Sequence, residues 1–152
     1  MNFRDLLKAW LPVVLWMTLI FWGSTDVMSA EQTSRFLVPF LRWLNPDISP
    51  AALAKAHFLL RKTAHVTEYA ILAGLLFRGW RSVLSDLWGR STAALVGAML
   101  FALSDEFHQS FTASRTGSLG DVLFDSSGAL IGVILCAIFA SRTGDSQNAP
   151  EP

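Results

Sequence analysis

Ionisable residues interrupt three of the four apolar stretches in this chain, at positions where a lipid bilayer tolerates them poorly. A charged side chain at the hydrocarbon centre costs about 2.5–3.5 kcal/mol on insertion scales, so such residues usually face one another or a polar cavity. The second stretch carries Lys62, His65 and Glu68, and the fourth opens with Asp121 and Asp125. The third ends in acidic and amide residues. These residues predict a polar site enclosed by packed helices.

The composition favours a membrane protein. Of the 152 residues, 52% are hydrophobic and 16% are charged, whereas about a quarter of the residues in a soluble domain are charged. The formal net charge is zero, so the chain has no basic field for a nucleic acid, and we expect no such partner. The single cysteine, Cys136, excludes an internal disulfide. The fold class expected is therefore all-α and polytopic, with the lipid bilayer as its surroundings.

We expect four transmembrane helices in one small bundle, because each stretch approaches the roughly 20 residues that cross a bilayer core. The four spans are expected at 6–23, 57–80, 93–109 and 119–140. Arg4 and Lys8 precede the apolar core of the first span, as basic residues do in a secretory signal, but no small-x-small cleavage site comes closely after it. It is therefore expected to be a retained span.

The rest of the chain is more polar. The bundle is expected to form a single domain over residues 1–140, with a polar loop over 24–56. Within that loop, apolar residues recur at helical spacing from Phe36 to Leu44, which favours a short amphipathic helix at the membrane interface or against the bundle. Residues 141–152 are expected to form a disordered polar tail.

The distribution of Lys and Arg indicates the orientation. Six lie near the termini or in the loop between the second and third spans, namely Arg4, Lys8, Arg78, Arg81, Arg90 and Arg142. Four lie on the other side over a longer stretch, namely Arg35, Arg42, Lys55 and Arg115. The positive-inside rule therefore places both termini in the cytoplasm. All the unusual polar residues then lie at the extracytoplasmic end of the bundle.

Helical spacing places these polar residues on single faces, because residues three and four apart share one face of a helix. Three spans thus each offer a polar stripe at one depth, which predicts an outward-facing polar pocket. Its expected residues are Lys62, His65, Glu68, Asp105, Glu106, Gln109, Arg115, Asp121 and Asp125. Below the acids of the fourth span, Gly128 and Gly132 would let another helix approach closely.

Three ordered motifs carry a family resemblance. They are RKTAHVTEY at 61–69, SDEFHQSF at 104–111 and RTGSLGDVLFDSSGALIG at 115–132. With these motifs the chain resembles the VanZ-like family of small bacterial membrane proteins, and Ser24 matches a serine that the family often has after its first span. The resemblance implies a multi-pass protein of the bacterial inner membrane with a role in the cell envelope. The namesake is associated with reduced susceptibility to teicoplanin. The resemblance leaves the reaction open.

The function expected is binding or modification of an anionic envelope lipid or cell-wall precursor, with an effect on glycopeptide susceptibility. Lys62 and Arg115 would hold the anion, because both are cations that pair with phosphate or carboxylate. His65, supported by Glu68, would be the catalytic pair if there is proton transfer. The residues leave open whether the protein is an enzyme and whether it forms oligomers.

Three other readings remain open. The polar residues could form an internal salt-bridge network in a non-catalytic scaffold, with Lys62 paired to Glu68 or Asp125 and Arg115 paired to Asp105 or Asp121. The protein could be a membrane enzyme, either a phosphoryl-group hydrolase or a metal-dependent one. No metal or other cofactor is expected, because Lys62 and Arg115 would oppose a dication. A transporter is disfavoured, because the polar residues are confined to one leaflet.

Overall fold

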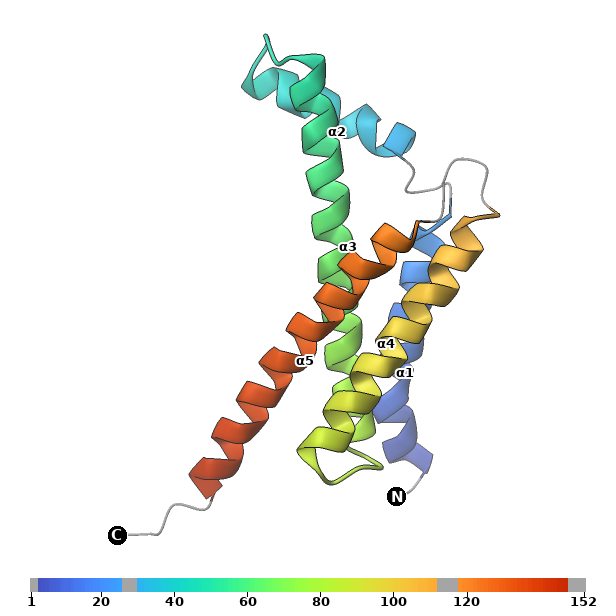
Figure 1. Ribbon diagram of the computed structural model, residues 1–152, viewed down its shortest axis with the longest axis vertical. Coiled ribbons are helices and arrows are strands. Elements are labelled where there is room, and N and C mark those ends of the chain that lie inside the picture. The colour runs from blue at the N-terminus through green and yellow to red at the C-terminus, as the bar shows by residue number, and fades with distance from the viewer. Residues whose placement is uncertain (1–2, 26–29, 112–117, 148–152) are drawn as a thin grey trace.

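The computed structural model describes residues 3–25, 30–111 and 118–147. These residues form five helices and no strand, which confirms the all-α class. The helices are α1 (Phe3–Gly23), α2 (Ala30–Leu44), α3 (Pro50–Trp80), α4 (Leu87–Gln109) and α5 (Leu119–Gln147). The longest, α3, packs against α1, α4 and α5, while α2 lies beside the N-terminal part of α3 (Figure 1).

Three helices are long and apolar enough to cross a membrane: α1, α4 and residues Leu119–Thr143 of α5. Their presence supports a membrane protein, as the composition indicates. The fourth expected span lies in α3, which is about 46 Å long at 1.5 Å per residue. Because Lys62, His65 and Glu68 interrupt its apolar part, α3 does not meet the same criterion. The fourth transmembrane helix stays a prediction.

The helices extend beyond the expected spans where the sequence provides caps. At the start of α3, Ser49 accepts a hydrogen bond from the Ala52 amide at 3.2 Å, and Pro50 occupies the first turn. At the start of α4, the Asp86 carboxylate accepts from the Gly89 amide at 2.6 Å. These caps explain why α3 and α4 begin seven and six residues before the expected positions of 57 and 93.

Two further segments differ from the simplest reading of the sequence. The loop expected over 24–56 contains α2, so its apolar spacing does mark a helix. The expectation of a disordered tail from residue 141 is wrong up to Gln147, because α5 continues to that residue. No proline follows Asp121 before Pro150, so no strong helix breaker ends α5 earlier. Residues 148–152 lie outside the described part.

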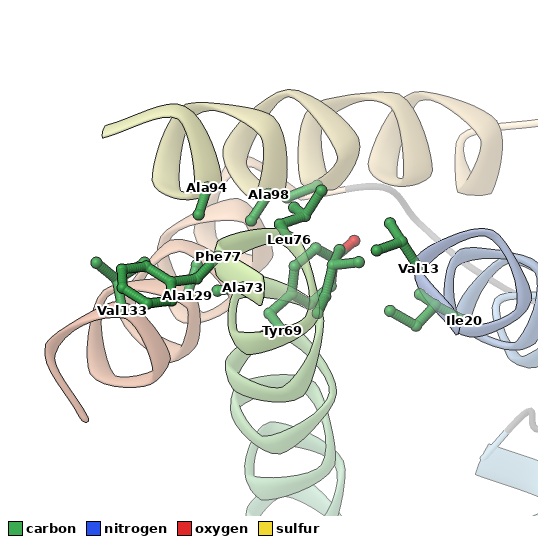
Figure 2. Close-up of a cluster of buried hydrophobic side chains, with 12 residues drawn as sticks. Val13, Ile20, Tyr69, Ala73, Leu76, Phe77, Ala94, Ala98, Ala129 and Val133 are labelled. Atoms are coloured by element: carbon green, nitrogen blue, oxygen red, sulfur yellow. The ribbon is translucent and has the colours of Figure 1, made fainter. Parts of the chain in front are cut away.

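The apolar core lies where α3 meets α1, α4 and α5 (Figure 2). On α4, Ala94, Ala98 and Ala102 recur every four residues and are fully buried, so small side chains let α4 approach α3 closely. On α5, Gly128 and Gly132 likewise let the helix approach α3 closely. A Cβ added at Gly128 would lie 2.8 Å from the Val66 Cα, and one added at Gly132 would meet the backbone of Ala70. The predicted close approach is confirmed, and α3 is the helix that approaches.

Candidate functional site

The buried faces of α3, α4 and α5 are apolar along the core and become polar toward one end of the bundle. On α4, the face of Ala98 and Ala102 continues into Asp105, Glu106 and Gln109. The polar residues gathered there, called the polar cluster below, are Ser24, Lys62, His65, Asp105, Glu106, Gln109, Asp121 and Asp125. All but Asp121 are buried, and Asp121 is mostly shielded. The predicted convergence of three polar stripes is therefore present.

Two pairs join α3 to α5. The Lys62 ammonium contacts an Asp121 carboxylate oxygen, and it lies 4.6 Å from the ring centroid of Phe124. One turn deeper along α3, His65 Nδ1 lies 2.9 Å from Asp125 Oδ1. The alternative of an internal salt-bridge network paired Lys62 with Glu68 or Asp125, and this pairing is wrong. Lys62 lies about one turn before His65 on α3, and Asp121 lies about one turn before Asp125 on α5. Each α3 residue therefore contacts the aspartate at the same height on α5.

A second set of contacts joins the end of α1 to α4. The Ser24 hydroxyl donates to Asp105 Oδ2 at 2.7 Å. Gln109 Nε2 donates to the same carboxylate oxygen at 2.9 Å and to the Ser24 hydroxyl at 3.3 Å. Two donors on one oxygen stabilise the Asp105 carboxylate in a buried position. This serine is therefore a member of the polar cluster, through contacts that its sequence position alone does not reveal.

A third group of side chains is less well satisfied. Glu106 Oε2 accepts a hydrogen bond from the Ser118 amide at 2.7 Å, just before α5 begins. The other Glu106 oxygen and Asp125 Oδ2 are buried and have no hydrogen-bond partner among the residues that the structure describes. One possible ligand atom each from His65, Glu106 and Asp125 lie within 4.8 Å of one another. These three residues are called the buried trio below.

A cavity of about 670 Å³ opens beside the polar cluster, between α1, α2 and α3. Most of its wall is apolar and includes Leu19, Trp22 and Phe58. Its polar lining is Ser24, Thr33, His57, Arg61, His65 and Glu68. Ser24 and His65 belong to both the cavity wall and the polar cluster, so the two features are continuous.

Most predicted site residues meet in this region, but they occupy two distinct places. Lys62, Asp105, Glu106, Gln109, Asp121 and Asp125 lie in the polar cluster, whereas Glu68 lines the cavity and His65 lies in both. Arg115 lies outside the described residues. The carboxylate in contact with His65 is that of Asp125, in the position that the sequence reasoning gave to Glu68.

Two cavity residues were not selected from the sequence. His57 lies at the start of the expected second span. Its Nε2 lies 3.3 Å from the Ser34 hydroxyl of α2, and the residue lines the cavity. Arg61 precedes Lys62 and was treated only as part of the motif, but it also lines the cavity. The signal available in the sequence was spacing, because residues 57, 61, 65 and 68 share one face of α3.

The chain matches a known protein family. The family model described as VanZ/LLP1 matches residues 9–140, which includes most of the chain and the three motifs. The resemblance noted from the motifs is therefore confirmed. Searches of the curated proteins and of the solved structures give no significant match.

Proposed function

The chain belongs to the VanZ/LLP1 family, and from this premise we propose that it is a bacterial inner-membrane protein that binds an anionic envelope lipid or lipid-linked cell-wall precursor. The observation that carries this proposal is the cavity, which joins a long apolar wall to a polar end at Ser24, His65 and Glu68. A lipid has the same division between an apolar chain and a polar head group.

The proposed head-group site lies along α3. Arg61 lines the cavity and would pair with phosphate in bidentate fashion, and His57 lies one turn away. Lys62 was expected to grip the anion, but its ammonium contacts Asp121 and is therefore neutralised inside the bundle. We transfer that role to Arg61, while a role for Arg115 stays a prediction. If the protein catalyses a reaction, His65 is the residue to move a proton, because it lies in the cavity wall and against Asp125.

Lipid binding is tested by thermal unfolding of the detergent-purified protein with undecaprenyl phosphate, its pyrophosphate and bulk phospholipids. Native-state binding raises the melting temperature by mass action. Ala64→Phe should fill the cavity and abolish the shift, whereas Ala51→Phe, an exposed position of α3 that does not line the cavity, should retain it. Arg61→Gln should weaken the response to the phosphates, and the exposed Arg81→Gln should not. Equal responses in all variants would refute the proposal.

The proposal includes α3 as the fourth transmembrane helix, with both termini in the cytoplasm. The ionisable residues Lys62 and His65 are buried, so the lipid would meet mainly apolar side chains such as Leu59, Leu60 and Ile71. In a Cys136→Ser background, a cysteine replacing Asp47 should react with a membrane-impermeant maleimide in intact cells. One replacing Ser85 should react only after lysis. The opposite pattern would refute this topology.

A second candidate function is a non-catalytic scaffold whose polar residues only fix the helix arrangement. The pairs Lys62–Asp121 and His65–Asp125 favour it, since both join α3 to α5. This reading expects Glu68→Gln to destabilise the fold and to leave lipid responses unchanged. The lipid-site reading expects the reverse.

A difference in teicoplanin susceptibility between a deletion strain and its complement tests the proposed effect on glycopeptides, with the Ala64→Phe gene as the control for the cavity.

A further inference from the structure

The buried trio of His65, Glu106 and Asp125 has the composition and spacing of a cation site. Imidazole nitrogen and carboxylate oxygen are the usual ligands of divalent transition metals in proteins. Each residue comes from a different helix, α3, α4 or α5, and none is more than 7% exposed. A cation at this point would therefore be enclosed by the three helices that form the centre of the bundle.

The unpartnered oxygens supply a second observation. Buried polar atoms in native proteins nearly always have a partner, because an unsatisfied buried group is costly. Glu106 Oε1 and Asp125 Oδ2 are both buried without a partner among the described residues, and both belong to the trio. A cation or a proton can satisfy such acceptors, since an ionised carboxylate has no hydrogen to donate.

The charges of the neighbours favour a cation. Lys62 is held by Asp121, and Asp105 receives two hydrogen bonds from neutral donors on its Oδ2, while its Oδ1 has no partner among the described residues. With a neutral imidazole, the two carboxylates of the trio carry two negative charges, which one dication would neutralise. Of the two cations expected to oppose a dication, Lys62 is paired with Asp121, and Arg115 lies outside the described residues.

We propose that His65, Glu106 and Asp125 bind one divalent transition-metal cation such as Zn²⁺ or Mn²⁺. Ligands at 2.0–2.2 Å from one ion lie at most about 4.4 Å apart, so the separations of up to 4.8 Å need only small side-chain adjustments. Three protein ligands leave a coordination position for water or for a bound anion. His65 also lines the cavity, so this position would lie close to the proposed head-group site, although the cation site does not depend on lipid binding.

The first test is the metal content of the full-length protein, purified through a tag without histidines and dialysed against metal-free buffer. Mass spectrometry should find about one transition-metal ion per chain in the wild type. Glu106→Gln and Asp125→Asn should each lower this content at least tenfold. Asp86→Asn, an exposed acid at the other end of α4, and Ser24→Ala, a cluster residue outside the trio, should retain the ion.

A second test needs no variant, so it is informative even if a substitution prevents folding. After removal of metal by a chelator, Co²⁺ added to the wild-type protein should produce visible absorption bands, and equimolar Zn²⁺ should abolish them. Metal-free wild-type protein should also melt at a lower temperature than protein with Zn²⁺ or Mn²⁺. No retained ion together with no response to any of these cations would overturn the proposal and assign protons to the unpartnered oxygens. Equal metal binding by Asp125→Asn would overturn it as well.

Discussion

Replacing Gly128 with alanine tests whether close packing of α5 on α3 holds the polar cluster together. The added Cβ would lie 2.8 Å from the Val66 Cα and closer still to the Val66 carbonyl oxygen. Carbon atoms in contact are normally about 3.5–4.0 Å apart, so α5 would have to retreat by about 1 Å. Both clashing atoms belong to the backbone of α3, so no side-chain rotation can relieve the overlap.

Three effects set the change in the free energy of unfolding of Gly128→Ala. Overpacking costs about 1–3 kcal/mol, and alanine regains about 1 kcal/mol over glycine through helix propensity. A shift of about 1 Å would also break the His65–Asp125 contact of 2.9 Å, which lies one turn away and contributes about 1 kcal/mol. The net expectation is a loss of about 1–3 kcal/mol in the free energy of unfolding.

The measurement is titration with sodium dodecyl sulfate in mild detergent, followed by circular dichroism. Gly74→Ala is the matched control, because its Cβ would lie 3.5 Å from the Cys136 sulfur, an ordinary contact. Gly97→Ala is a second control, with its nearest neighbour a flexible Leu76 methyl at 3.5 Å. Both controls should be unchanged or more stable by up to about 1 kcal/mol. If Gly128→Ala were as stable as the controls, the close approach of α5 to α3 would be refuted.

Three further predictions use the same titration. Lys62→Met should cost about 3 kcal/mol because it leaves Asp121 unpaired at a shielded site, and adding Asp121→Asn should restore at least half of that loss; additive effects would contradict a coupled pair. Ser24→Ala should lower the free energy of unfolding by about 1.5–3 kcal/mol, because it removes the 2.7 Å hydrogen bond to the Asp105 carboxylate of α4. The control Ser127→Ala should lower it by less than about 0.5 kcal/mol, because this exposed hydroxyl bonds within its own helix. Leu72→Ala should cost about 2–3 kcal/mol, because this side chain is fully buried and leaves a cavity; a neutral result would place Leu72 outside the core.

Helix faces were predictable from the sequence because a helix has a fixed period. The positions of His65 on α3, Asp105 on α4 and Asp125 on α5 each follow from spacing, and all three are buried in the structure. The close approach at Gly128 was predictable for the same reason, since small residues one turn apart on an apolar helix favour packing.

The pairing of side chains across helices was not predictable, because it depends on the relative height of two helices. A shift of one turn moves a side chain by about 5.4 Å, more than the length of any hydrogen bond. Lys62 accordingly contacts Asp121, where the sequence alone allowed Glu68 or Asp125. The role of Ser24 was hidden for the same reason, since its partner Asp105 lies 81 residues away.

The arrangement of polar and apolar side chains explains how this chain places many ionisable groups within apolar helices. Leu130, Ile131 and Phe139 of α5 are exposed, while Asp125 on the same helix is fully buried. The outside of the bundle is therefore apolar and the cost of the polar groups is met by contacts between helices. Those contacts pair Lys62 and one oxygen of Asp105 but leave an oxygen each of Asp105, Glu106 and Asp125 without a described partner. A structural network gains nothing from unsatisfied acceptors. Their presence, in a cluster that shares Ser24 and His65 with the cavity wall, therefore favours a site that accepts a ligand over one that only fixes the helices.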